Sequence, residues 1–286
     1  MSTTAAKGDS SVATATNIDD EVIARAAARL AGAVRTGRPC TAVRDLIGSD
    51  NVAAAYRVQE QFNALLDDGR RTVVGRKIGA TSAAVQEQLG VDQPDFGVLF
   101  SDMVFNDGAT IPTGRLLQPK AEAEVAFRLV EDLATGSLDV AQCRAAVGEA
   151  VAAIEVVDSR ILEWDISFAD TVADNASSGV FVLGSRWRSL TEFEPVDVAM
   201  SMSIDGVVVS SGGGVDCLGD PLNALSWLAR RAREFGTPLE AGQIILSGAL
   251  GPMRPLHPGA QITVTISGLG EVSASFTPDL EVTEHE

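Results

Sequence analysis

Apolar positions in the first quarter of the chain recur at the three- and four-residue spacing of an amphipathic helix. Ile23, Ala27, Leu30 and Ala31 follow this spacing, and residues 52–65 repeat it. The stretch between them, TGRPCTAVRDLIGSDN, carries the Gly, Pro and Ser that interrupt helices. The pattern predicts a helical lobe over residues 19–75, preceded by a disordered tail at residues 1–18.

The character of the sequence changes after Gly69, and strand-like runs dominate from Gln118 onward. Two helical stretches interrupt these runs, around 139–151 and in PLNALSWLARRAREFG. A further short helix is expected in AAVQEQLG. The turns IDGV and GLGE are expected to close hairpins, and the triple glycine 212–214 to form a hairpin loop. The chain is therefore predicted to be an α+β protein with a β-rich catalytic domain over residues 76–286. The predicted strands lie in RTVVGRKIGAT, AEAEVAFRLV, AAIEVVDSRI, GVFVLGS, AMSMSIDGVVVSSG, QIILSGAL and QITVTISGLGEVSASF.

Composition narrows the functional classes. The 286 residues are 45% hydrophobic and 21% charged, which is enough apolar material for a substantial core. A net charge of -17 argues against nucleic-acid or anionic-membrane binding, since both need basic surface. Cys40, Cys143 and Cys217 form no CxxC pair, and neither a signal peptide nor a membrane-spanning run is evident. We expect a cytoplasmic protein with no nucleic-acid or membrane partner.

Two carboxylates stand one residue apart in QPKAEAEVAF. Strand side chains alternate, so Glu122 and Glu124 share one face. They either face water from an edge strand or hold a metal ion between them. Glu155, in the apolar run AAIEVVDSR, is either paired with Arg128 or Arg160 or is a third ligand. Three carboxylates without a nearby histidine would suit Mg²⁺ or Mn²⁺ better than zinc.

Lysine and histidine are scarce. Lys77 lies between two glycines in GRKIGAT, where the backbone can approach a ligand closely, and it could offer a positive charge or a proton. Lys120 precedes the acidic pair and could simply balance its charge. The only histidines, His257 and His285, lie in a Pro-flanked turn and at the chain end. Serine–histidine–aspartate chemistry is therefore not expected, and acid–base work would fall to carboxylates, lysine or metal-bound water.

Further candidates lie in loops. Asp95 in DQPDFG, and Asp170, Asp174 and Ser177 in DTVADNASSG, are candidates for acid–base or binding roles. Acidic residues in loops are also common turn formers, which is the alternative interpretation of both segments.

Seven segments together carry a resemblance to a known family. GRKIGATS, VDQPDFGVLFSDM, LQPKAEAEVAF, EVVDSRI, DTVADNASSGVFVLG, CLGDPLNALSWLA and ILSGALGPM, in this order, resemble the 2-hydroxypenta-2,4-dienoate (2-keto-4-pentenoate) hydratases of the fumarylacetoacetate hydrolase superfamily. The resemblance covers about residues 70–276. It implies a mixed β-sandwich or roll core with an N-terminal helical lobe, and a Mg²⁺ or Mn²⁺ ion held by Glu122, Glu124 and Glu155.

The resemblance also implies a reaction. The enzyme would add water to 2-hydroxypenta-2,4-dienoate, or a longer 2-hydroxydienoate, in meta-cleavage catabolism of aromatic or steroid rings, giving a 4-hydroxy-2-oxoacid. Lys77 would polarise the oxoacid or donate a proton, and Asp95 would handle the proton of the attacking water. Ser177, Ser247 and Lys120 would bind the substrate. A homo-oligomer is expected.

Three alternatives remain open. A 2-oxo-3-hexenedioate (4-oxalocrotonate) decarboxylase would use the same metal, although no obvious extra basic residue meets a second carboxylate. A carbon–carbon bond hydrolase ranks third, because it would be expected to use a histidine near the N-terminal side of the site, where this chain has none. A non-catalytic partner subunit or cation-binding structural module is the alternative of another class, and association with other pathway enzymes fits either role.

Overall fold

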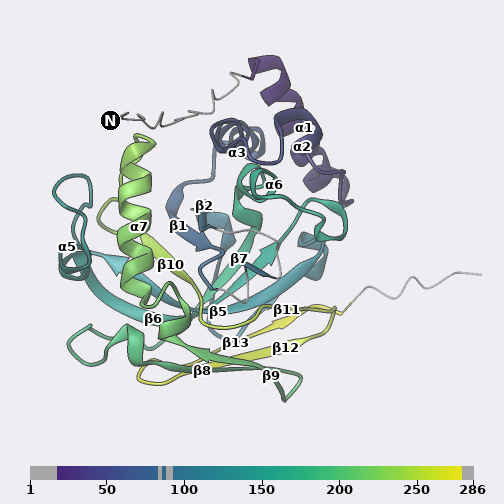
Figure 1. Cartoon of the computed structure of the whole chain (residues 1–286). Helices are drawn as coiled ribbons and strands as arrows, with labels where there is room; N and C mark the ends of the chain where they lie inside the picture. The colour runs from purple at the N-terminus through teal and green to yellow at the C-terminus, as the bar shows by residue number, and fades with distance from the viewer. Residues whose placement is uncertain (1–17, 83–85, 88–92, 279–286) are drawn as a thin grey trace, which may run out of the picture.

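The computed structural model describes residues 18–82, 86–87 and 93–278. Within these residues, thirteen strands are interspersed with helices (Figure 1). The helices are α1 (Asp20–Thr36), α2 (Arg44–Ile47), α3 (Val52–Leu66), α5 (Val140–Ala146), α6 (Phe168–Ala173) and α7 (Pro221–Glu234). The strands are β1 (Val73–Gly79), β2 (Asp95–Phe100), β3 (Val104–Asn106), β4 (Ala109–Ile111), β5 (Pro119–Leu129), β6 (Val147–Asp158), β7 (Ser178–Leu183), β8 (Ala199–Ile204), β9 (Val207–Gly213), β10 (Ile244–Ala249), β11 (Arg254–Pro255), β12 (Gln261–Ile266) and β13 (Gly270–Phe276).

The larger sheet has eight strands and contains the long pair β5 and β6. Its order is β2-β1-β10-β5-β6-β7-β3, and β11 pairs with β5 beyond the end of β10. β5 and β6 are antiparallel and pair along nearly their whole length. Both strands are almost entirely buried, which explains why their sequences read as apolar runs.

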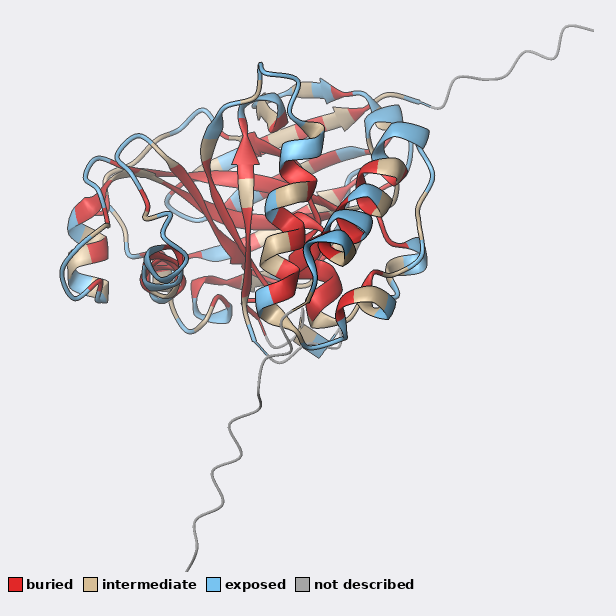
Figure 2. Cartoon of the chain, turned by 90° about the horizontal axis from the view of Figure 1, so that it is seen from above, coloured by how far each residue is buried: buried red, intermediate tan, exposed pale blue. Residues whose placement is uncertain are grey.

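The smaller sheet closes the core from below in the view of Figure 1. Its five strands follow the order β4-β13-β12-β8-β9. Alternating residues of β12 and β13 face the larger sheet, and α7 packs on the same hydrophobic core. This two-layer packing buries the middle of β5 and β6, as the buried strands in Figure 2 show.

Helices α1, α3 and α6 share a second, smaller core. Asp19 caps the first turn of α1 through its side chain, and Gly37 ends the helix in the left-handed conformation. Ile23, Ala27 and Leu30 on α1 are fully buried, so the predicted helical periodicity is confirmed in this segment. Because α6 belongs to the later part of the chain, this cluster joins the N-terminal helices to the loop that precedes β7.

The hairpin predictions at IDGV and GLGE are confirmed by the β8–β9 and β12–β13 pairings. The hairpin-loop prediction for residues 212–214 is wrong, because Gly212 and Gly213 end β9 and the chain turns instead at Asp205 and Gly206. The helix expected around 139–151 ends at Ala146, where β6 begins. The tail and most of AAVQEQLG lie outside the described residues.

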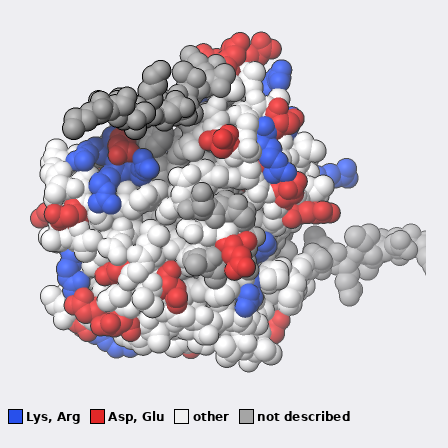
Figure 3. Space-filling view, in the orientation of Figure 1, with Lys and Arg blue, Asp and Glu red and all other residues white. Residues whose placement is uncertain are grey.

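Charged side chains of both signs are interspersed over the face shown in Figure 3, and basic ones gather near the end of α7. The last turn of α7 carries Arg231 and Arg233, as suits the negative end of a helix dipole. Among the described helices, none is long and apolar enough to cross a membrane.

Candidate active site

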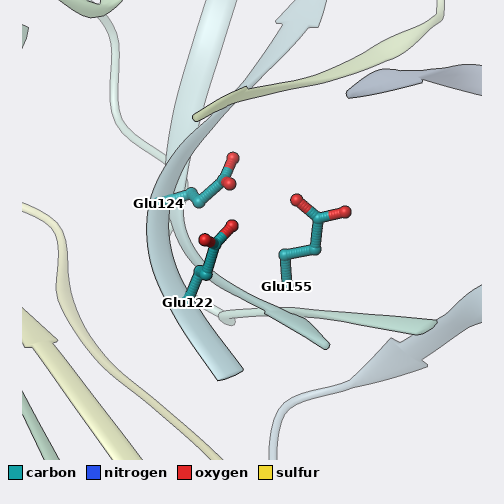
Figure 4. A group of neighbouring side chains, drawn as sticks. All are labelled: Glu122, Glu124 and Glu155. Carbon is teal, nitrogen blue, oxygen red and sulfur yellow. The ribbon is translucent and has the colours of Figure 1, made fainter. Parts of the chain in front are cut away.

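Three glutamates converge on one space at the centre of the larger sheet (Figure 4). Glu122 and Glu124 project from the same face of β5, and Glu155 lies directly across from Glu122 in the β5–β6 register. One carboxylate oxygen from each residue lies within 4.8 Å of the other two. β5 is an interior strand between β10 and β6, so the alternative of a water-facing edge strand is wrong.

All three carboxylates are buried, and this has an electrostatic cost. Burial and the neighbouring Glu155 raise the pKa of Glu122 to about 7, and the same two causes hold the pKa of Glu124 well above its usual value. Glu124 Oε1 and Glu155 Oε2 find no hydrogen-bond donor among the described residues. Buried, unpaired oxygens grouped at this spacing fit the all-oxygen donor set that a hard divalent cation requires.

One backbone group also supports the triad. The Gly248 N–H donates a hydrogen bond to Glu124 Oε2 at 2.7 Å. A register shift in β10 between Leu246 and Ala249 aims this N–H at the carboxylate. Glu124 is therefore fixed through one oxygen, while its other oxygen faces the space between the three glutamates.

Lys77 on β1 reaches the triad across β10, the strand that separates β1 from β5. Its side chain is 2% exposed, and its Nζ lies 3.1 Å from Glu155 Oε1 and donates to Ala176 O at 2.8 Å. Burial alone would lower the pKa of Lys77, but Glu155, Asp95 and the other acids outweigh it and raise that pKa above its usual value. Lys77 is therefore a buried ammonium among carboxylates.

Asp95 begins β2, next to the end of β1. Thr171 Oγ1 donates to Asp95 Oδ2 at 3.1 Å, and burial raises the pKa of Asp95 while the Lys77 charge opposes that rise. Gly79 pairs with Asp95 across the two strands. A Cβ at Gly79 would lie 3.2 Å from Asp95 Cγ, so the absence of a side chain there makes room for the carboxylate.

Ser177 lies on a loop with an unusual backbone. Asn175, Ala176 and Ser177 have φ angles of 57°, 51° and 50°, which are uncommon for residues other than glycine. The Asn175 side chain fixes the loop by accepting from Val98 N and donating to Val98 O, at 2.8 and 2.9 Å. Ser177 lines a small cavity of about 20 Å³ with Lys77, and its Oγ has no described partner.

The other two substrate-binding candidates lie farther from this cavity. Ser247 precedes Gly248 and is fully buried, with its Oγ unpartnered among the described residues, but it does not line the cavity. Lys120 Nζ lies 4.0 Å from the centre of the Trp164 ring. Trp164 lines both the small cavity and a wider one of about 490 Å³, and Lys120 borders only the wider one.

The remaining acidic candidates have structural partners. Asp174 forms a buried ion pair with Arg160, and Asp170 accepts hydrogen bonds from the backbone N–H of Val43 and Arg44. The pairing proposed for Glu155 is wrong, because Arg160 binds Asp174 and Arg128 binds the side chain of another glutamate, Glu149.

Three contributors were not predicted from the sequence: Thr171, Trp164 and the Gly248 N–H. Thr171 stands in the segment DTVADNASSG on α6, but its partner Asp95 lies on β2, so no local signal indicates the contact. Trp164 has a positive φ of 57°, which no local motif indicates.

Comparison with known proteins gives a consistent result. The chain matches the family described as fumarylacetoacetate (FAA) hydrolase C-terminal over residues 72–277. It is 51% identical over 259 residues to a 2-keto-4-pentenoate hydratase of Burkholderia vietnamiensis (strain G4), covering 91% of this chain and 99% of that protein. It is 38% identical over 261 residues to a 2-hydroxyhexa-2,4-dienoate hydratase of Comamonas testosteroni, with the same coverage of both chains.

Solved structures share the architecture. A 4-oxalocrotonate decarboxylase from Pseudomonas putida G7, complexed with magnesium and adipate, superimposes with a TM-score of 0.85 at 32% identity, covering 91% of this chain and 98% of that one. A fumarylpyruvate hydrolase from Pseudomonas aeruginosa, in complex with Mn²⁺ and pyruvate, has a TM-score of 0.57 at 16% identity. It covers 73% of this chain and 90% of that one, and at this identity it shows the fold alone.

Proposed function

The chain belongs to the fumarylacetoacetate hydrolase family, and on that premise we propose that it is a metal-dependent hydratase of meta-cleavage catabolism. It adds water to 2-hydroxypenta-2,4-dienoate, or a longer 2-hydroxydienoate, and yields a 4-hydroxy-2-oxoacid. The observation that carries this proposal is the buried triad of Glu122, Glu124 and Glu155 with Lys77 and Asp95 beside it. Hydratase relatives that are 51% and 52% identical to this chain, over 99% and 96% of their own length, support the same reaction.

The three glutamates would hold the metal ion, a role supported by the unpaired oxygens of Glu124 and Glu155 and by the burial of all three carboxylates. Magnesium and manganese are the ions in the structures of the decarboxylase and the hydrolase described above, and both prefer oxygen donors. When bound, the ion supplies a positive charge that favours negative charge developing at the carboxylate end of the substrate.

Lys77 is assigned to hold a proton at Nζ beside the substrate oxygen. The ammonium is already anchored by Ala176 O and Glu155, so its position is fixed before the substrate arrives. In the first stage, the dienol loses the proton of its 2-hydroxyl group and gains one at C5, giving the conjugated 2-oxo-3-enoate. A fixed ammonium stabilises the charge that develops on the 2-oxygen during this transfer.

Asp95 is assigned to accept the proton of the attacking water. The water oxygen bonds to C4 and a proton is added at C3, so the product has gained one water molecule. The Thr171 hydroxyl holds the carboxylate in place, and burial makes Asp95 a stronger base than a solvent-exposed aspartate. A positioned acid–base group of this kind contributes about 10²–10⁴ to the rate.

Ser177 and Ser247 are proposed to bind the substrate carboxylate, and Lys120 to act at the approach. Ser177 has the stronger support, because its free hydroxyl lines the cavity beside Lys77. That cavity is only about 20 Å³, so the substrate must displace a lining side chain such as Trp164 or Met253 to enter.

Decarboxylation of 2-oxo-3-hexenedioate is the second candidate, favoured by the likeness to the 4-oxalocrotonate decarboxylase. A dicarboxylate needs a second cationic partner. Of the described residues that line the small cavity, Lys77 is the only cation. This charge pattern suits a monocarboxylate and supports the hydratase.

The assembly and location of the enzyme are part of the same proposal. We expect a cytoplasmic homo-oligomer, with residues 19–75 as a helical lobe and 76–286 as the catalytic domain. Val207 and Val208 on the edge strand β9 are both 64% exposed, and such apolar edges are often covered by another subunit. Association with other pathway enzymes would use surfaces of this kind.

The test is an ultraviolet assay with freshly generated 2-hydroxypenta-2,4-dienoate, in EDTA and then with Mg²⁺ or Mn²⁺ restored. We expect metal-dependent loss of dienol absorbance and a product one water heavier. Glu155→Gln should abolish activity and weaken Mn²⁺ binding, whereas Glu149→Gln, which alters a half-buried carboxylate on the same strand that is paired with Arg128, should leave both unchanged. Metal-dependent release of CO₂ from 2-oxo-3-hexenedioate, without hydration, would favour the decarboxylase instead.

A further inference from the structure

A separate cavity, of about 270 Å³, lies on the other side of β1 and β2 from the glutamate triad. It occupies the region where α3 and the end of α7 approach these strands (Figure 1). Its size is close to the lower end of the range for small-molecule pockets, roughly 300 Å³. None of the groups assigned to the proposed hydratase reaction lines it. Its principal lining residues are Tyr56, Gln59, Asn63, Arg76, Phe96 and Phe235.

Arg76 is the feature of this cavity that requires explanation. It precedes Lys77 on β1, so strand alternation directs the two cationic side chains to opposite faces of the sheet. Arg76 is only 8% exposed, and its Nε and Nη1 donate no hydrogen bond to any described residue. No carboxylate of the described residues lies within ion-pair distance of it. Buried guanidinium groups are normally paired, because an unpaired one loses its hydration without compensation.

The walls around Arg76 are aromatic. The Tyr56 ring stacks on Phe96 at a centroid distance of 4.5 Å and contacts Phe235 at 4.4 Å. Phe235 is 44% exposed, so one aromatic wall reaches the surface. A single cation at the base of flat, apolar walls is complementary to a flat molecule that carries one negative group at its end.

The charges at the rim restrict the ligand further. Glu60 lines the cavity from α3, and Glu240 is close enough to oppose the lowering of the Arg76 pKa by burial. Arg231 on α7 is close enough to Tyr56 to oppose the rise of the Tyr56 pKa on burial, and basic side chains gather over the end of that helix (Figure 3). One buried cation with mixed charges at the rim suits a monoanion and disfavours a dianion.

We propose that this cavity binds a small aromatic or conjugated monocarboxylate. The carboxylate pairs with the Arg76 guanidinium, and the flat apolar body lies against the wall formed by the Tyr56, Phe96 and Phe235 rings, which contact one another. Planar guanidinium and carboxylate groups match each other in two parallel hydrogen bonds, which would satisfy the Arg76 donors that lack partners. The site is separate from the glutamate triad and requires no metal ion.

The test is calorimetric titration of the full-length, EDTA-treated protein with benzoate, and with benzamide as its neutral isostere. We expect saturable benzoate binding with one site per chain, and benzamide binding at least tenfold weaker. Arg76→Gln should weaken benzoate binding roughly ten- to a hundredfold, the range given by a charged hydrogen bond of about 1.5–3 kcal/mol. Arg128→Gln, which removes another partly buried arginine that lies over an aromatic ring, Trp187, should leave binding unchanged.

Two further variants separate this site from its alternatives. Phe235→Ala removes an exposed aromatic wall without opening the core, so it should fold and bind benzoate more weakly even if Arg76→Gln does not fold. The Glu155→Gln variant should bind benzoate with the affinity of the wild type. If this variant loses benzoate binding, the benzoate lies in the triad cavity and the proposal is overturned. Absence of saturable binding by the wild type would also overturn it. So would an Arg76-dependent oligomer without benzoate binding, since an acidic group of a second copy would then occupy the site.

Discussion

Replacement of Gly79 by alanine tests whether the position of Asp95 matters for the reaction. Gly79 does not have a positive φ, so alanine can adopt its backbone conformation without strain. The added Cβ would lie 3.2 Å from Asp95 Cγ and 3.5 Å from Lys77 Nζ. It would overlap Asp95 Oδ1, which lies closer to it than the van der Waals contact distance. The substitution therefore acts on the carboxylate, and it leaves the two proposed catalytic side chains chemically intact.

The expected effect follows from this geometry. The Asp95 carboxylate must move by roughly 1 Å, and a misplacement of that size can cost about 10²-fold in rate. Overpacking of a buried site typically costs about 1–3 kcal/mol of unfolding free energy, so the variant should still fold. We expect Gly79→Ala to lower kcat by about 10²-fold, with Mn²⁺ affinity almost unchanged because the three glutamates are untouched.

The assay is steady-state hydration of 2-hydroxypenta-2,4-dienoate, followed together with urea unfolding. Gly32→Ala is the matched control, because Gly32 lies inside α1 with no atom near its added Cβ. That change should leave kcat unaltered and stabilise the protein by about 0.5–1 kcal/mol. A folded Gly79→Ala enzyme with wild-type kcat would refute the role assigned to the position of Asp95.

Three other substitutions probe the neighbouring groups. Lys77→Met should lower kcat by at least about 10²-fold while Mn²⁺ binding persists, as kinetics and calorimetry would show; unchanged turnover would refute the lysine's role. Lys120→Met should raise KM about two- to fivefold with little change in kcat, since a cation–π contact is worth about 0.5–1 kcal/mol at exposed sites; a fall in kcat alone would contradict its place at the approach. Asn175→Ala should lower the free energy of unfolding by about 2–4 kcal/mol in urea melts, because it removes two hydrogen bonds to Val98. An unchanged free energy of unfolding would show that these two hydrogen bonds do not hold the loop.

Strand periodicity predicts part of the candidate site from the sequence. Glu122 and Glu124 are two residues apart, so any strand directs both to one face. Glu155 could be recognised only as a carboxylate embedded in an apolar run. Its place opposite Glu122 depends on the pairing of β5 with β6, which α5 separates in the chain, and pairing partners are decided by tertiary packing.

Other parts of the site have no local sequence signal. The Gly248 N–H reaches Glu124 because the register of β10 shifts, and a register shift depends on the neighbouring strand. The left-handed run at residues 175–177 contains no glycine, so nothing in DTVADNASSG indicates it. It persists because Asn175 bonds to β2 on one side and Ala176 O accepts from Lys77 on the other.

The two faces of β1 have opposite charge imbalances, and each imbalance indicates the sign of its ligand. On one face, Lys77 is, of the residues that the structure describes, the single buried ammonium among four buried carboxyl groups, those of the triad and Asp95. That excess of acid can be stabilised by protonation or by an added cation, and unpaired oxygens at metal-ligand spacing favour the cation. On the other face, Arg76 has no acid in ion-pair range among the described residues, and a guanidinium cannot be neutralised by losing its proton. An external anion is then the remaining way to satisfy it, so adjacent residues of one strand are expected to serve ligands of opposite charge.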